Sequence, residues 1–401
     1  GVAAMGQETY DNAQLASKDL NGTARYVGMG GAMEALGADI STMSSNPAGI
    51  GLFRRSMISG SFGFNSQSDA ADIGKRKTKA SFDHAGFVHI MRSGRNSYVN
   101  FGVSYTKSRN FNQILTATGR LNGASQNKLS SMKNYNDLYR LEKRNGELTS
   151  QWGTNNNPDL PYNQVDYLYS NALLNDKNSQ LVGMNANGYN GGNYLGDASG
   201  VLDASGNLRA AYYNADGYDF FRGTSGYIGE YNFNISGNSR NRFYWGLTFG
   251  LYDVNYSHAS EYTERLVNNA QNPIGTVTIA DERTISGTGF DIKAGVIFRP
   301  IEDSPFRVGL YVHTPTWYDL KTENRTTLVS KLADGCGNGN KSTSGRYDYK
   351  FYTPWRFGGS LGYTVGKHLA LGATYEYADY SYSDIRVNEG GVYDYWGNYY
   401  E

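Results

Sequence analysis

The sequence predicts an all-β protein, and more specifically a transmembrane antiparallel β-barrel. Composition is the first indication: 50 Gly, 34 Tyr and 17 Phe in 401 residues are too many for a disordered chain. The hydrophobic content of 39% is low for a large soluble core. No stretch approaches 18 consecutive apolar residues, so no membrane-spanning helix is expected. Long alternating segments and the lengths of their connections are the other two indications.

From residue 54 onward, nine segments alternate between apolar and polar or small residues with a period of two. In the clearest segment, Phe243, Trp245 and Leu247 share one face, while Tyr244 and Gly246 share the other. Several segments have nine or ten residues, the length that a strand tilted by ~45° needs to cross a bilayer. The nine predicted strands cover 58–64, 82–91, 99–105, 227–235, 243–251, 290–298, 306–312, 357–365 and 369–377.

The connections between these strands alternate between short and long. The short ones are 93–96, 236–241, 299–305 and 366–367, and the long ones are 65–78, 112–223, 257–283, 319–345 and the segment after 383. Short periplasmic turns at one rim and long extracellular loops at the other are typical of outer-membrane barrels. A soluble β-sandwich is the alternative, but it gives no reason for such regular alternation.

The connection 112–223 is too long for a structureless loop. Apolar residues recur at helical spacing in two patches of it, which are Leu129, Met132, Leu138 and Leu141, and then Val165, Leu168, Ala172 and Leu173. Two helices at the outer mouth would either form an apolar landing site or pack as a closed surface insertion. The first alternative makes Leu168, Leu173 and Leu174 candidate ligand-binding residues.

The two ends of the chain differ from the barrel pattern. Residues 1–6 are small and apolar and end in a small-x-small sequence, which indicates the remnant of a signal peptide; a cloning remnant is the alternative. Residues 7–53 do not alternate and are rich in small residues, so they are expected to fill the barrel lumen as a plug. Bacterial barrels have an even number of strands, so nine strands in 54–401 predict an incomplete barrel with further strands beyond Glu401.

Two motifs in the N-terminal segment carry a family resemblance. The stretch from Arg25 through Gly28 and Gly31 to Ala32 is followed by Asn46-Pro47-Ala48 just before the first strand. Together they resemble the outer-membrane long-chain fatty-acid transporter family, including its aromatic-hydrocarbon transporters and Bacteroidetes-type members. The resemblance is densest over 19–64, and the remainder of the chain agrees only in architecture.

The resemblance implies a monomeric barrel of 14 strands with an N-terminal hatch in its lumen, and with nine strands in this sequence about five are then expected beyond Glu401. In this family, hydrophobic molecules enter at extracellular loops, reach an interior pocket and leave through a gap at a kinked third strand. The hatch motif would be Asn46, Pro47 and Ala48, together with Arg25, Gly28 and Gly31. The implied partners are a hydrophobic small molecule and the lipid and lipopolysaccharide of a Gram-negative outer membrane.

Other classes of function lack support in the sequence. Charges balance at 37 basic and 37 acidic residues, which disfavours nucleic-acid binding. The single Cys336 excludes an intrachain disulfide, and the five scattered histidines predict no metal site. We find no phosphate loop, nucleophile elbow or other cofactor motif, and the one faint catalytic pair is His313 near Asp319. The protein is therefore not expected to be an enzyme.

Two functions remain consistent with the sequence. The leading prediction is passive, hatch-gated uptake of hydrophobic small molecules such as long-chain fatty acids. The alternative is a non-transporting barrel of the same fold that acts as a docking or secretion-associated adaptor. A transporter requires an apolar pocket between hatch and wall, whereas an adaptor requires a filled lumen and a binding patch on its loops.

Overall fold

The protein is described here by a computed structural model. It describes residues 13–70, 72, 76–135, 164–174, 198–202, 208–302, 304–333, 339–366, 368–387, 392–393 and 399–400. The predicted signal-peptide remnant at 1–6 and the predicted helical positions Leu138 and Leu141 lie outside the described residues.

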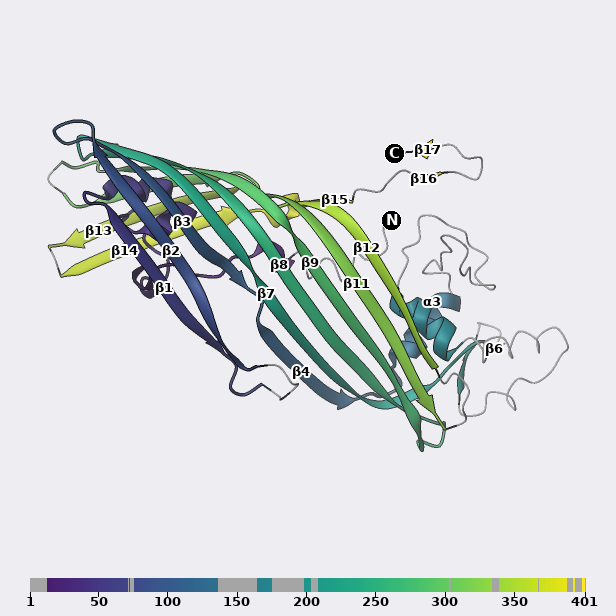
Figure 1. The fold of residues 1–401 in the computed structure, drawn as a ribbon. Helices are drawn as coiled ribbons and strands as arrows, with labels where there is room; N and C mark the ends of the chain where they lie inside the picture. Colours follow the sequence, from purple (N-terminus) through teal and green to yellow (C-terminus); the bar gives the residue numbers. More distant parts are fainter. Residues whose placement is uncertain are drawn as a thin grey trace.

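The fold is dominated by one long, curved antiparallel sheet of 13 strands (Figure 1). Nine strands follow one another in the order β1-β2-β3-β7-β8-β9-β10-β13-β14, while β4, β11, β12 and β15 pair beside this path. The strands are β1 (Met57–Ser66), β2 (Thr78–Arg92), β3 (Tyr98–Asn110), β4 (Gln113–Arg120), β7 (Asn214–Ser239), β8 (Phe243–Val267), β9 (Pro273–Phe298), β10 (Arg307–His313), β11 (Trp317–Leu332), β12 (Gly339–Tyr352), β13 (Arg356–Val365), β14 (Leu369–Ala378) and β15 (Asp384–Val387).

The nine predicted strands are confirmed, and they are the nine strands of the continuous path. Two of the predicted long loops are wrong. Most of 257–283 belongs to β8 and β9, which a short turn connects, and most of 319–345 belongs to β11 and β12. These extensions alternate with the opposite polarity, because many of their apolar residues, such as Val277 and Leu328, face inward, whereas most of their outward positions are polar or charged. Outward-facing polar residues of this kind resemble loop composition.

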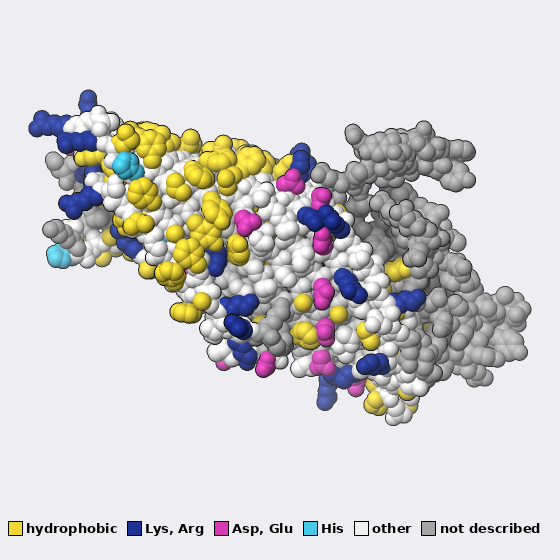
Figure 2. Space-filling model, in the orientation of Figure 1, with side chains coloured by type: hydrophobic (Ala, Val, Ile, Leu, Met, Phe, Trp, Pro, Cys, Tyr) yellow, Lys and Arg dark blue, Asp and Glu magenta, His cyan; other side chains and the backbone are white. Residues whose placement is uncertain are grey.

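One face of the sheet, called the outer face below, carries an exposed apolar band near the short turns. Figure 2 shows this band at one end of the molecule and charged side chains along the remainder. Cross-strand pairing aligns one row of mostly aromatic residues at the edge of the band, and we call it the aromatic row. It contains Tyr105, Tyr231, Leu251, Phe290, Trp317 and Tyr352, which are successive partners across six strands.

Beyond the aromatic row, the strands continue as what we call the charged extension. On its outer face, opposite charges face each other across β11 and β12. The pairs in register are Asp319 with Lys350, Lys321 with Asp348, and Glu323 with Arg346. Directly opposed unlike charges support strand pairing in water, so this part of the sheet is suited to an aqueous surface.

The N-terminal segment lies against the other face of the sheet, called the inner face. It contains the short helices α2 (Ala24–Gly28), η1 (Ile40–Ser44) and η2 (Pro47–Leu52). Its hydrogen bonds reach strands at both ends of the path, from Ser61 on β1 to Thr374 on β14. A side chain at any of five inner-face glycines would collide with this segment: Gly86, Gly102, Gly246, Gly295 and Gly372. Glycine therefore permits close docking here.

The far end of the charged extension is covered on its inner face by the insertion. This region contains α3 (Gln126–Tyr135), α4 (Gln164–Leu168), the π-helical turn η3 (Tyr169–Leu173) and the small sheet of β5 (Ser199–Leu202) and β6 (Leu208–Tyr212). Both predicted helical patches are thus helical where they are described. A further short pair, β16 (Val392–Tyr393) and β17 (Tyr399–Tyr400), and the turn η5 (Tyr380–Tyr382) complete the elements. Among the described residues, no helix is sufficiently long and apolar to cross a membrane.

Candidate functional site

The third strand of the path is interrupted at Phe111 and Asn112. Both β3 and β4 pair with β7, but the two residues between them leave the strand pattern. The Asn110 side chain accepts a hydrogen bond from the N–H of Asn112 at 3.1 Å, which is an Asx-type turn. Opposite the break, Gly226 has φ +112°, a conformation that favours glycine, and its carbonyl accepts a bond from Phe111 N–H.

The break separates the β1–β2 hairpin from β4. Pairing of β2 with β3 ends at His84 and Thr106, and β7 is the one strand that pairs with β4 in the described part of the chain. Side chains bridge the resulting gap. The Gln67 amide accepts a bond from the N–H of Ile114 at 2.7 Å, and Lys79 Nζ donates to the Asn112 side chain at 2.7 Å.

A cavity of about 400 Å³ lies at this break, and we call it the polar pocket. It is lined by Gln14, Asp19, Asn65, Gln67, Arg109, Asn110, Phe111, Asn112, Gln113, Thr224 and Tyr256. A smaller adjoining hollow shares five of these residues and adds Ile114 and three cations. We call these cations, Arg76, Lys77 and Lys79, the basic rim. Most lining side chains are amides or cations, so the pocket offers many hydrogen-bond donors.

The inner wall of the polar pocket belongs to a second feature, which we call the aromatic cluster. Phe111 and Tyr256 line the pocket, and their rings meet edge to face with the ring centroids 4.9 Å apart. Leu15 and Ala16 of the N-terminal segment are buried within this cluster, at 3% and 4% exposure. Its other members are Ile228, Tyr252, Val254, Ile285, Tyr318, Leu320, Tyr349 and Phe351.

Below the aromatic cluster, buried charges connect the N-terminal segment to the inner face. Lys18 Nζ lies 3.2 Å from one carboxylate oxygen of Glu230, and Lys293 Nζ lies 3.1 Å from the other. Lys293 also pairs with Asp291 at 2.6 Å, and the Tyr252 hydroxyl donates to Asp291 at 2.7 Å. Burial makes unpaired charge costly, so each member depends on its partners. We call this set the ionic cluster.

The predicted hatch residues Asn46, Pro47 and Ala48 lie where the N-terminal segment contacts the sheet. The Asn46 side chain caps η2 by accepting the Ala48 N–H at 3.1 Å and donates to the Val296 carbonyl at 3.4 Å. Pro47 is at the first position of η2, where its missing N–H has no cost. Ala48 is fully buried against Tyr244 and Ile297.

The upstream part of the motif is more exposed. Arg25 Nε pairs with Asp39 at 3.0 Å, and Asp39 also accepts the Thr23 hydroxyl and caps η1, so the upstream part of the motif is joined to the start of η1. Gly28 is exposed, and a methyl group added there would meet nothing within 4 Å, whereas Gly31 has φ +80° and is buried beside Leu20. None of these six hatch residues lines the polar pocket.

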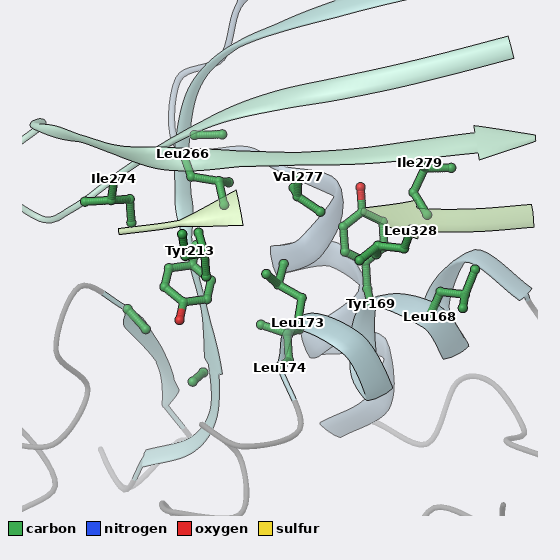
Figure 3. Close-up of a cluster of buried hydrophobic side chains, with 14 residues drawn as sticks. Leu168, Tyr169, Leu173, Leu174, Tyr213, Leu266, Ile274, Val277, Ile279 and Leu328 are labelled. Carbon is green, nitrogen blue, oxygen red and sulfur yellow. The ribbon is translucent and has the colours of Figure 1, made fainter. Parts of the chain in front are cut away.

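The candidate ligand residues Leu168, Leu173 and Leu174 are buried in the insertion. They pack with Leu266, Val277 and other strand residues in a closed hydrophobic cluster at the far end of the charged extension (Figure 3). The segment of α4 and η3 therefore packs against the sheet. A ligand-binding role for these leucines stays a prediction.

One acid secures the insertion to this cluster. Glu264 is buried on β8 and accepts bonds from the N–H of Gln126 and from the side chains of Asn127 and Tyr262. Burial raises the pKa of the Glu264 carboxyl above its ordinary value, although these hydrogen bonds oppose the shift. The carboxyl thus links α3 to the strand in a position where its charge is disfavoured.

The faint catalytic pair is not brought together. His313 is buried on the inner face with Nε2 2.5 Å from the Ser45 carbonyl oxygen, whereas Asp319 is exposed on the outer face. Within the described residues, no group of three or more His, Cys, Asp or Glu side chains is suited to hold a metal ion.

Sequence reasoning had missed the polar pocket, the aromatic cluster and the ionic cluster. The signals were short: Asn110-Phe111-Asn112 interrupts an alternating segment, and Glu230, Asp291 and Lys293 occupy the polar face of predicted strands. Neither signal shows which residues meet across the sheet. Comparisons with models of protein families, with curated proteins and with solved structures found no match. The family resemblance of 19–64 therefore stays a prediction.

Proposed function

We propose that this chain is an outer-membrane β-barrel whose N-terminal segment is a hatch in the lumen, and that it takes up hydrophobic small molecules. The apolar band supports the membrane part of the proposal. It covers the outward positions from Phe243 to Leu251 on β8, a length suited to a tilted strand crossing hydrocarbon. The aromatic row at its edge has the position of an interfacial aromatic girdle.

The position of Leu15 and Ala16 is the observation that carries the uptake proposal. These two side chains occupy an aromatic cluster that adjoins the polar pocket at the strand break. A hydrophobic ligand that displaced them would contact the same aromatic wall and bury comparable apolar surface. The N-terminal segment would then act as a competitor of the ligand, and its displacement would be the gating step.

The size of residue 15 tests this proposal. We expect Leu15→Ala to increase binding of radiolabelled palmitate or naphthalene to the full chain in lipid nanodiscs, because the smaller side chain vacates part of the cluster. Leu15→Trp is expected to decrease binding. Leu247→Ala, on the outer face, is the control and should leave binding unchanged. Unchanged binding in both Leu15 variants would mean that the aromatic cluster is only a packed core.

The second candidate function is the docking or secretion-associated adaptor. The closed cluster of Figure 3 supports it, because the insertion fills the inner face of the charged extension. An adaptor would retain its function when the aromatic cluster is changed and lose it when the insertion is changed. Both functions keep the proposed location in the outer membrane, the contact with its lipid and lipopolysaccharide, and the monomeric state.

A further inference from the structure

We propose that the polar pocket and its basic rim bind an anionic saccharide, that is, a sugar bearing a carboxylate or a phosphate. This site is separate from the uptake of hydrophobic molecules and does not depend on it. The observations that carry it are the charge of the rim, the chemistry of the lining and its position relative to the apolar band.

The charge of the rim is not neutralised by neighbouring carboxylates. Among the described residues, Arg76, Lys77 and Lys79 form no ion pair, and Lys79 instead contacts the neutral side chain of Asn112. The one acid of the lining, Asp19, is paired with Arg109. Guanidinium and ammonium groups that have no carboxylate partner can form strong, charge-assisted hydrogen bonds to the carboxylate or phosphate of a ligand.

The lining of the polar pocket is suited to hydroxyl groups. Amide side chains both donate and accept hydrogen bonds, as a sugar hydroxyl does, and separate parts of the chain bring them to the pocket, among them Gln14, Asn65, Gln67 and Gln113. Some of these amides already bond within the protein, as Gln14 does to Arg109 and Gln67 to Ile114, and an apolar ligand could not pair with the donor and acceptor positions that remain. Acidic residues of the hairpin loop, Asp69 and Asp72, are not among the lining residues.

The position of the pocket relative to the apolar band indicates where such a ligand would be met. Tyr105 belongs to the aromatic row, and Arg109 lies just beyond it along the same strand. The pocket therefore opens at the polar side of the apolar band, at the level expected for lipid head groups. An anionic saccharide at that level is either the head group of a glycolipid or a free sugar.

The test compares sugars that differ only in charge. Full chain in phosphatidylcholine nanodiscs should bind D-galacturonic acid about tenfold more tightly than D-galactose, as measured by calorimetry, because one charge-assisted hydrogen bond is gained. The variant Arg76→Gln/Lys77→Gln/Lys79→Gln should lose this preference. The matched control Arg55→Gln/Arg95→Gln/Arg240→Gln, which removes three exposed basic residues elsewhere, should keep it.

A second arm distinguishes the two sources. Nanodiscs containing lipid A or dephosphorylated lipid A replace the free sugar, and copurifying glycolipid is measured by mass spectrometry. Retention of the phosphorylated form by the wild type but not by the rim variant supports a membrane source; binding of the free sugar alone supports a soluble source. Equal binding of charged and neutral ligands, or an unchanged preference in the rim variant, overturns the proposal while leaving palmitate binding and the uptake proposal untouched.

Discussion

The apolar band and the charged extension are built from the same strands with opposite polarity. On β7, β8 and β9, the band has apolar residues outside and polar or charged residues inside, such as Asn232, Thr248 and Lys293. In the extension most outward positions are polar or charged, and Leu266, Val277 and their neighbours are buried inside, together with a few charged residues such as Glu264. Strand formation is therefore independent of which face is apolar, and the surroundings of each face decide its composition.

Disrupting the ionic cluster should cause the largest loss of stability among the changes that compare the band with the extension. Lys293→Met leaves the Glu230 and Asp291 carboxylates with less compensation inside the band, and we expect a loss of about 3–5 kcal/mol in the free energy of unfolding. Urea unfolding in lipid vesicles measures it.

The matched change in the extension is Lys321→Met, which removes an ion pair with Glu323 on the outer face. It should have a much smaller effect, because exposed pairs are screened by water and salt. Equal losses in the two variants would contradict the distinction between the inner face of the band and the outer face of the extension.

The next largest loss of stability is expected from a charge placed on the outer face of the band. Leu247→Arg in the middle of the band should destabilise the protein in vesicles by about 2–4 kcal/mol, because a guanidinium would replace an apolar group in hydrocarbon. Thr284→Arg is equally outward but lies in the extension, and should change stability by no more than about 0.5 kcal/mol. A tolerated Leu247→Arg would argue against a membrane around the band.

Filling one inner-face glycine tests the docking of the N-terminal segment. Gly295→Val places a side chain against Asn46 and should cost about 1–3 kcal/mol, the usual range for overpacking. Limited proteolysis should then cut the segment 13–53 faster than in the wild type. In the control, Gly359→Val, the added group first meets Leu310 at 3.7 Å, so protection should persist. Equal protection in both variants would show that close docking is not required.

The smallest expected effect is the pH dependence of the insertion. Because the pKa of Glu264 is raised in the folded state, the folded protein binds more protons than the unfolded chain as pH rises above 4.5. Stability in the extension should therefore fall as pH rises from 4.5 toward the raised pKa. Urea midpoints across this range should lose that dependence in Glu264→Gln, while the exposed control Glu282→Gln keeps it.

Residues of the band were predictable because their pattern has one physical cause. Phe243, Trp245 and Leu247 alternate with Tyr244 and Gly246, and each outward apolar residue reinforces the same period of two. The extension was not predicted from the same test, because its apolar residues, such as Val277 and Leu328, occur among Thr, Asp and Arg residues that resemble a polar loop. A strand whose apolar residues face inward and whose outward residues are polar is therefore easily taken for a loop.

The candidate site was less accessible to sequence reasoning than the strands. Asn46, Pro47 and Ala48 were singled out, and their cap and turn chemistry is local, so a short motif can encode it. Lys18 and Glu230, in contrast, are 212 residues apart and meet only because the N-terminal segment docks on β7. No local pattern distinguishes such a pair from two solvated charges.

By itself, the sequence determined that the chain forms antiparallel strands and which of their faces is apolar in the band, because both follow from the alternation of neighbouring residues. Tertiary structure decided the remainder: the extension of β8, β9, β11 and β12, the docking of residues 13–53, and the pocket at Phe111 and Asn112. These features depend on contacts between residues distant in the chain. The fold decides which residues lie opposite each glycine and each charge. It therefore decides whether a glycine serves in a turn or in close docking, and whether a charge is solvated or buried.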